Sequence, residues 1–288
     1  MKFSASAESV VLEALRVVVP GASGRTLRQM LQQGRVHLNG EVCRIASHPV
    51  QPGDVLEVGR RLPAVLEGGL KIVHEDRDIV VVHKPAGLLS VATPHESENT
   101  AHAFLRRHVR SRGGQRTVFV VHRLDKFVSG LLLFAKSESA HTSLRSLFEA
   151  HAIDRRYWAI VEGHVEKDSG TIESHLAEDR TMRMRSTKNS GEGKRAVTHY
   201  RVLRRFPEMT SLEVTLETGR KNQIRAHLSE LGHPIVGDRA YGSTMDPLGR
   251  MGLHAFRLGF MHPSRQQPML FETDPPSEFR PYVLRSRH

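Results

Sequence analysis

The sequence is poor in cysteine and aromatic residues, with a single cysteine, Cys43, among 288 residues and 6% Phe, Trp and Tyr. One cysteine cannot form an internal disulfide, and it excludes a cluster of thiolate metal ligands. No apolar run approaches the roughly 18 residues that a membrane-spanning helix needs. The first residues also lack the pattern of a signal or transit peptide. We therefore expect a cytoplasmic protein with no membrane partner.

Motifs for nucleotide cofactors, metals and hydrolytic nucleophiles are missing as well. There is no GxGxxG, GxSxG or HExxH pattern, and the spacing of the 18 histidines does not match a zinc site. The segment SGEGKR, residues 190–195, would need glycine in place of Lys188 to form a phosphate-binding loop. We therefore expect a reaction that uses no nucleotide cofactor and no metal ion.

Acidic residues are outnumbered, because 31 Asp and Glu face 42 Lys and Arg, which gives a net charge of +11. This balance indicates a polyanionic partner. The charge is clustered, since residues 180–205 hold nine basic residues and one acidic residue, Glu192. A second basic group comprises Arg106, Arg107, Arg110, Arg112 and Arg116. Neither group has the bulky apolar face of a membrane-surface helix, so nucleic acid is the favoured partner.

The first sixty residues have the pattern of a small separate module. Apolar residues recur at helical spacing within residues 6–21 and 23–34, and Ser23 is placed to cap the second helix. The pair Asn39 and Gly40 then predicts a tight turn between two short strands. A last strand is expected within residues 50–59. The module is therefore a small α/β unit.

This module resembles an S4 RNA-binding domain over residues 8–59, on the segments SGRTLRQMLQQGRVHLNGEV and PGDVLEV. The Arg-Leu-Asp sequence that usually begins the domain is absent. The resemblance implies that the second helix and the following loop face RNA. Arg25, Arg28 and Arg35, which we expect to be exposed, are then candidate phosphate contacts.

The rest of the chain predicts a larger unit. Residues 60–71, with Pro63 and a Gly-Gly pair, have no clear period and are expected to form a linker between a domain at 1–59 and a domain at 72–288. Strands dominate the second domain and do not alternate strictly with helices, which predicts an α+β fold with a mixed, largely antiparallel sheet. Strands are expected at 79–82, 118–121, 131–135, 158–161, 197–203 and 212–216, and helices at 101–108, 140–150 and 222–231.

The segment HRLDKFVS, residues 122–129, places charged side chains between two apolar runs. Charged groups beside a core are costly unless they are paired, and loops held by strands often carry the chemistry of a protein. Asp125 is a candidate nucleophile, which has to be ionised and is helped by a nearby guanidinium. His122 is expected to be structural.

Arg225 is a second candidate partner for Asp125, besides Arg123 two residues away. If Asn222 caps the helix at 222–231, Arg225 lies in the first turn, where the helix dipole is already positive. A cation is unfavourable there unless an anion is bound. The position therefore predicts a carboxylate or a phosphate beside Arg225.

The segment HRLDKFVSGLLLFAKS resembles the catalytic motif of pseudouridine synthases of the ribosomal large-subunit type. Further segments are similar to other blocks of that family, in the same order and over about residues 70–265: KIVHEDRDIVVVHKPAGLLS, RRYWAIVEG, GKRAVTHYRVL, ETGRKNQIRAHLSELGHPIVGDRAYG and LHAFRLGFMHP. The resemblance implies an isomerase that converts uridine to pseudouridine in RNA and uses no cofactor.

The same resemblance implies roles for individual residues. Asp125 would be the catalytic aspartate, and Arg123 would fill the gap left when the target base flips out. Tyr157 would stack on the uracil and take part in removal of the C5 proton. Arg225 would pair with the aspartate. Beside these four residues, Arg220 is a candidate RNA contact. Whether Asp125 attacks the sugar at C1′ or the base at C6 stays open.

Three positions depart from the family pattern, because Val128, His83 and Asn222 replace threonine, asparagine and histidine. None of these changes removes a candidate catalytic residue. Ribosomal RNA is the favoured substrate, with transfer RNA as the alternative, and we expect a monomer. A catalytically silent RNA-binding or ribosome-assembly protein with the same fold is the competing interpretation. A nuclease is disfavoured because no carboxylate cluster is present to hold metal ions.

Overall fold

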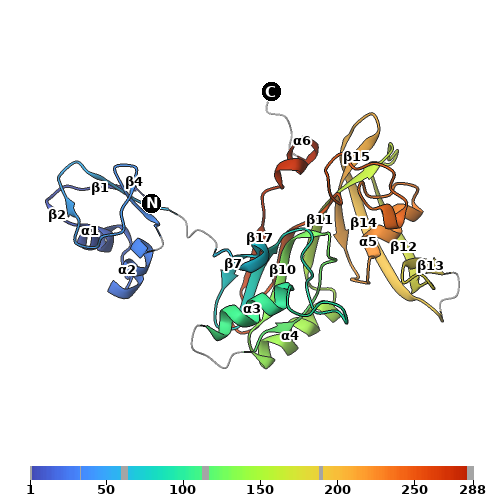
Figure 1. The fold of residues 1–288 in the computed structure, drawn as a ribbon, viewed down its shortest axis with the longest axis horizontal. Helices are drawn as coiled ribbons and strands as arrows, with labels where there is room; N and C mark the ends of the chain where they lie inside the picture. Colours follow the sequence, from blue (N-terminus) through green and yellow to red (C-terminus); the bar gives the residue numbers. More distant parts are fainter. Residues whose placement is uncertain (1, 33, 60–63, 112–116, 188–190, 284–288) are drawn as a thin grey trace. The chain divides into compact units, whose positions relative to one another are not determined.

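The structure, a computed structural model, describes residues 2–32, 34–59, 64–111, 117–187 and 191–283. It consists of two compact units, Met1–Ala64 and Val65–His288 (Figure 1). The division falls within the expected linker, of which residues 60–63 lie outside the described residues, as do Arg112, Arg116 and Lys188 of the basic groups. Among the described residues no helix is long and apolar enough to cross a membrane.

The first unit has the predicted helices and hairpin. Its helices are α1 (Val11–Val18) and α2 (Gly24–Gln32), and its strands are β1 (Lys2–Ser4), β2 (Ser9–Val10), β3 (Val36–Leu38), β4 (Glu41–Val42), β5 (Pro49–Val50) and β6 (Val55–Val58). Ser23 Oγ accepts a hydrogen bond from Thr26 N at 3.2 Å, as the capping prediction requires. Asn39 and Gly40 form the hairpin turn with φ of 53° and 88°. One apolar core, including Leu15 and Leu27, joins both helices to the sheet.

The second unit is built on an eleven-stranded sheet in the order β13-β12-β14-β15-β11-β16-β10-β8-β7, with β17 paired to β16 and β9 to β10. The pair β10–β16 is parallel and the other described pairs are antiparallel, which confirms the predicted mixed, largely antiparallel α+β fold. The strands are β7 (Lys71–Glu75), β8 (Ile79–Lys84), β9 (Phe119–Val120), β10 (Ser129–Ala135), β11 (Asp154–Glu162), β12 (Ser169–Glu178), β13 (Met184–Thr187), β14 (Lys194–Arg205), β15 (Met209–Leu216), β16 (Leu253–Met261) and β17 (Pro268–Glu272).

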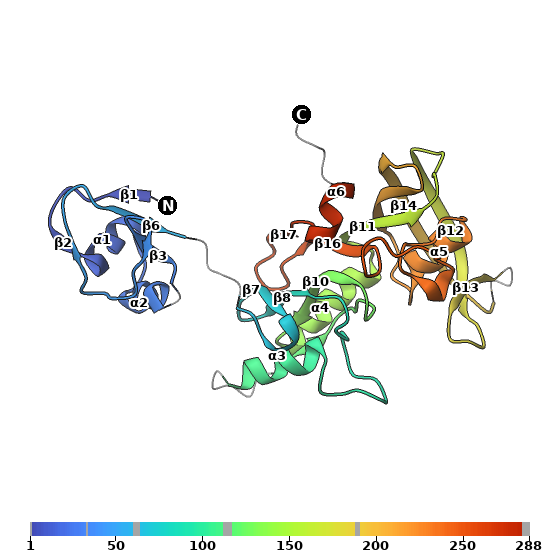
Figure 2. The same cartoon turned by 45° about the horizontal axis from the view of Figure 1, so that its top comes forward.

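Helices cover this sheet at two separate places (Figures 1 and 2). The helices α3 (Ala101–Arg110) and α4 (Glu138–Glu149) lie by β8 and β10, whereas α5 (Gln223–Glu230) packs on β13 and β14. The short α6 (Arg280–Val283) follows the last strand. The helices predicted at 101–108, 140–150 and 222–231 are confirmed, with ends shifted by one or two residues. The strand predicted at 118–121 is shorter and only half-buried, because it pairs with β10 over two residues.

The strand β10 lies inside the sheet, between β8 and β16, and all seven of its residues are buried. Its first residues pair in parallel with β16 at Ser129 and Gly130. Gly130 has a φ of 120°, and a Cβ at this position would collide with the backbone oxygen of Ala255. Only glycine permits this close approach. The turn that contains Asp125 is therefore attached directly to a buried strand that packs closely against its neighbour β16.

Candidate active site

Asp125 lies in a turn between β9 and β10 whose backbone is held at both ends. Val128 N donates to Asp125 O at 3.1 Å, which closes the turn. On the other side, Leu124 N donates to Ser90 Oγ at 3.0 Å, and this hydroxyl donates back to Leu124 O at 2.6 Å. The position of the Asp125 backbone is therefore set by contacts within the turn and with a separate loop.

Lys84 also supports this turn, and it was not identified as a site residue from the sequence. Its side chain is fully buried, and Nζ donates to the carbonyl oxygens of Lys126, Leu88 and Pro85 at 3.1, 2.7 and 3.0 Å. Burial lowers the pKa of Lys84 to about 7, although the charge of Asp125 acts in the opposite direction. Lys84 therefore ties the turn that contains Asp125 to the loop that follows β8.

Arg225 lies in the first turn of α5, as predicted, and contacts Asp125. Its Nη1 donates to Asp125 Oδ2 at 3.3 Å. Its main partner is Asp238, which the sequence did not reveal: Nε and Nη2 donate to the two Asp238 carboxylate oxygens at 2.7 and 2.8 Å. The guanidinium also lies over the ring of Tyr241, 4.6 Å from its centroid. Burial acts to lower the pKa of Arg225, but Asp238 and then Asp125 raise it overall.

The predicted side-chain cap of α5 is wrong. Asn222 occupies the N-cap position but has a left-handed backbone, with φ 49° and ψ 22°, and makes no capping hydrogen bond. Its amide nitrogen instead donates to Tyr241 Oη at 3.2 Å. The helix is fixed by Gln223 and by the buried His227, which hydrogen-bonds Thr198 Oγ1 at 2.8 Å. These interior contacts position Arg225 without a conventional cap.

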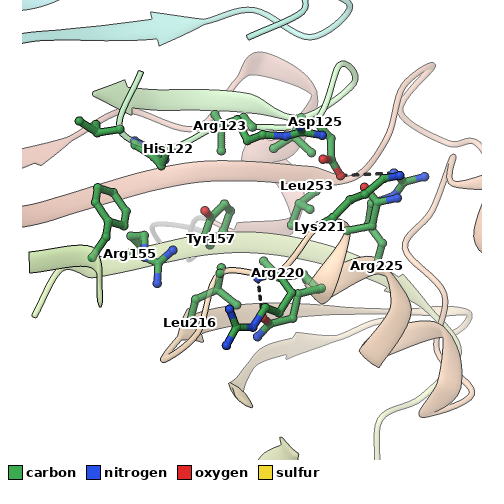
Figure 3. A pocket seen from close by; sticks show the side chains of 18 of the residues that line it. His122, Arg123, Asp125, Arg155, Tyr157, Leu216, Arg220, Lys221, Arg225 and Leu253 are labelled. Atoms are coloured by element: carbon green, nitrogen blue, oxygen red, sulfur yellow. Dashed lines mark hydrogen bonds and ion pairs between the residues drawn. The ribbon is translucent and has the colours of Figure 1, made fainter. Parts of the chain in front are cut away.

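A pocket of about 580 Å³ brings the candidate residues of the second unit together (Figure 3). Five predicted residues line it: Arg123, Asp125, Tyr157, Arg220 and Arg225. Tyr157 comes from β11 and is 7% exposed. Burial raises its pKa, while the nearby charge of Arg155 lowers it and that of Asp125 raises it. The pocket thus combines a carboxylate, an aromatic ring and several cations.

The three arginines predicted in the first unit differ in exposure. Arg25 and Arg28 are exposed on α2. Arg35 is half-buried, and its Nε donates to Gly59 O at 3.2 Å, so the expectation that it is exposed was wrong. Its position just before β3 directs the side chain toward the end of β6, where the carbonyl of Gly59 accepts the hydrogen bond.

A buried polar chain behind the Asp125 turn gives a prediction for pH dependence. Arg250 Nη2 donates to Ser129 Oγ at 2.6 Å, Ser129 hydrogen-bonds His254 Nδ1 at 2.6 Å, and His254 Nε2 hydrogen-bonds Thr273 Oγ1 at 2.9 Å. His254 is fully buried. Burial, together with the charges of His83 and Arg250, lowers its pKa to about 3. His254 therefore stays neutral in the folded protein at pH values where it is protonated in the unfolded chain.

The folded state should consequently lose stability as the pH falls from the ordinary histidine value of 6.5 toward 3. At pH 5 His254 alone is expected to lower the free energy of unfolding by about 2 kcal/mol relative to pH 7.5. Urea unfolding of the wild type and of His254→Gln at both pH values measures this. The variant should lose less stability on acidification than the wild type, whereas parallel losses would contradict the assignment.

One group among the described residues has the composition of a metal site. Ligand atoms of Asp76, Asp78 and His262 lie within 4.8 Å of one another. Asp76 already accepts hydrogen bonds from the backbone of Asp78 and Ile79 and from His262 Nε2 at 2.9 Å. These bonds account for the cluster as the closure of the turn between β7 and β8. None of its members lines the pocket.

Comparison with known proteins agrees with the fold. The family described as RNA pseudouridylate synthase matches residues 78–230, and the S4 domain matches residues 18–56. An uncharacterized RNA pseudouridine synthase of Aquifex aeolicus is 36% identical, covering 91% of this chain and 88% of its relative. Ribosomal large subunit pseudouridine synthase D of Zymomonas mobilis is 33% identical, covering 93% and 90%.

A solved structure supports the same relationship. Human RNA Pseudouridylate Synthase Domain Containing 1 is 28% identical and matches with a TM-score of 0.58, covering 72% of this chain and 84% of the human one. Both resemblances seen in the sequence are thereby confirmed. With an S4 domain before its catalytic unit, the chain belongs to the RNA pseudouridylate synthase family and is an isomerase that converts uridine to pseudouridine in RNA.

Proposed function

We propose that this enzyme modifies uridines of ribosomal RNA and that Asp125 is its catalytic carboxylate. The observation that carries the second part is the contact between Asp125 and Arg225 at the wall of the pocket. Among the described residues that line the pocket, Glu149 is the other carboxylate, and it is exposed at the end of α4. The first part follows from relatives named ribosomal large subunit pseudouridine synthase D.

The reaction needs one nucleophile and one proton transfer. The N1–C1′ bond breaks, the base turns, C5 joins C1′, and the proton lost from C5 is balanced by the proton gained at N1. Asp125 forms a transient bond either to C1′ or to C6 and is released at the end. Arg225 orients its carboxylate and supplies a counter-charge. No electrons are exchanged, so the side chains of the pocket are sufficient.

Access to the uridine requires that its base leave the RNA stack. Arg123 is exposed near Asp125 at the mouth of the pocket. Its side chain enters the RNA stack and fills the space that the flipped base leaves there. The Tyr157 ring is the platform on which the uracil stacks, and its hydroxyl takes part in the transfer of the C5 proton. Arg220 binds the RNA backbone at the rim.

The S4 domain, residues 1–59, contributes affinity through Arg25 and Arg28, while residues 72–288 carry catalysis. The double variant Arg25→Ala/Arg28→Ala is expected to bind RNA more weakly and to reduce the slope of log affinity against log salt by about 1.4–1.8. Its kcat should stay near that of the wild type. Filter binding at salt concentrations from about 50 to about 300 mM measures the slope. Arg16→Ala, an exposed change on α1, is the matched control, and an unchanged slope in the double variant would contradict the role.

The substrate is tested by conversion of unmodified transcripts of large-subunit ribosomal RNA, small-subunit ribosomal RNA and transfer RNA. Sequencing after chemical labelling of pseudouridine identifies the converted position. Conversion of a large-subunit uridine supports the proposal. Conversion of transfer RNA alone would show that transfer RNA, and not ribosomal RNA, is the substrate. Tight binding without conversion of any transcript or of ribosomal particles would favour a silent RNA-binding protein.

A further inference from the structure

Arg155 is a buried cation in the pocket that has no carboxylate partner among the described residues. It extends from β11 and is 7% exposed. Its Nε has no hydrogen-bond partner, and its Nη2 makes a single long contact, donating to Glu217 O at 3.4 Å. The guanidinium also lies 5.3 Å from the ring centroid of Phe148. Arginine carries five N–H donors, so most of them remain available.

Two further arginines of this unit, both partly buried, are paired with carboxylates. Arg225 pairs with Asp238 and Asp125, and Arg250 pairs with Glu278 at 3.1 Å. Burying a charge without a counter-charge costs several kcal/mol. Buried polar groups that lack partners are rare, and each requires an explanation such as a catalytic role or a bound water or ion. Because Arg155 lines the pocket, the Nη donors of its guanidinium can meet an acceptor on the substrate.

The guanidinium is held in place by the loop between β15 and α5. A Cβ on Gly219 would come within 2.5 Å of Arg155 Nη1, so the loop backbone packs directly on the side chain. The absence of a side chain at Gly219 allows this contact. Arg155 is thus fixed against the wall of the pocket and does not extend freely into solvent. A side chain that recognises one particular atom has to be fixed in this way.

The position of Arg155 relative to Asp125 indicates which acceptor it meets. Arg155 and Tyr157 lie two residues apart on β11, on the same face, and both line the pocket. Their Cα atoms are about 7 Å apart at this spacing. In Figure 3, Tyr157 lies between Asp125 and Arg155. A uracil stacked on Tyr157 with its sugar beside Asp125 turns the opposite edge of the ring toward Arg155. That edge carries O4, which lies across the ring from N1.

We propose that Arg155 donates a hydrogen bond to uracil O4 and thereby selects uridine over cytidine. Cytidine carries an amino group at C4, so two donors would face each other in a buried site, whereas O4 of uracil accepts. A site built to satisfy a buried hydrogen bond rejects the analogue that cannot form it. The inference rests on the proposed roles of Asp125 and Tyr157.

The test compares wild type and Arg155→Met on one RNA stem-loop that contains the uridine converted by the wild type. The stem-loop carries uridine, 4-thiouridine, or uridine with a methylphosphonate in place of its 5′ phosphate. We expect Arg155→Met to lower kcat/KM for uridine about 100-fold, and 4-thiouridine to lower it about 10-fold in the wild type only. The methylphosphonate should affect both proteins equally.

Controls separate recognition from folding. Arg156→Met, on the opposite face of β11, should keep the wild-type response to 4-thiouridine. Arg155→Lys retains a cation beside Phe148 and should show a reduced 4-thiouridine effect even if Arg155→Met folds poorly. If 4-thiouridine lowered kcat/KM equally in the wild type and in both Arg155 variants, the O4 contact would be overturned. Turnover of uridine by the wild type in the same experiment would leave the proposed function intact. A methylphosphonate effect that disappears in Arg155→Met would likewise overturn it, by assigning the residue to the phosphate.

Discussion

Asp125→Asn is expected to lower the single-turnover rate of pseudouridine formation by at least about four orders of magnitude, with RNA affinity within a few-fold of the wild type. Asparagine keeps the size of the side chain and its contact with Arg225, which approaches Asp125 Oδ2 at 3.3 Å. The amide is not a nucleophile at neutral pH, so it cannot form the transient bond. Rapid mixing of excess enzyme with RNA, followed by quantification of pseudouridine, gives the rate.

Glu149→Gln is the matched control for this experiment. Glu149 also lines the pocket, but it is exposed and pairs with Arg145 within α4 at 3.2 Å. Removal of its charge is expected to leave the rate within a few-fold of the wild type, because a surface pair of this kind contributes little. A rate for Asp125→Asn above about one hundredth of the wild-type rate would contradict the role of Asp125.

Asp238→Asn is expected to have the second largest effect, on stability as well as on catalysis. Asp238 is 2% exposed and binds Arg225 through both carboxylate oxygens. Removing one member of a buried ion pair costs about 3–5 kcal/mol of folding free energy, and Arg225 would keep a single carboxylate contact, with Asp125 at 3.3 Å. Arg225 also loses the contact that aims it at Asp125, so the single-turnover rate should fall by about 100-fold or more.

A double-mutant cycle isolates this pair. Urea unfolding is measured for Asp238→Asn, Arg225→Gln and the combined variant. Once Asp238 has lost its charge, the second substitution should cost much less than it does in the wild-type background, since the two side chains share their hydrogen bonds. Strictly additive losses would mean that the carboxylate does not support Arg225.

The local parts of the site could be predicted from sequence because each rests on short-range information. Asp125 stood out between two apolar runs, and the first turn of a predicted helix indicated that Arg225 needs an anion. The identity of that anion could not be predicted, because a helix dipole favours any negative charge near its first turn. Asp125 lies 100 positions from Arg225 in the sequence and Asp238 lies 13 positions from it, and both contact Arg225 only in the folded chain.

The errors have similar causes. Asn222 was expected to cap α5, but its left-handed backbone directs the side chain to Tyr241. Lys84 and Arg155 were missed because their importance lies in burial and in the number of available partners, which depend on tertiary structure. The sheet itself was predictable, since buried strands such as β10 appear as continuous apolar runs. The order of its strands required the structure.

The most direct test of the central claim is tritium release from ribosomal RNA transcripts that contain 5-tritiated uridine. Formation of the C5–C1′ bond must expel the C5 hydrogen, so each isomerised uridine releases one tritium to water. The wild type is predicted to release tritium in proportion to the pseudouridine formed, and Asp125→Asn to release none above background. Equal release by both proteins would contradict the account, because C5 would then lose its hydrogen without the carboxylate on which the mechanism depends.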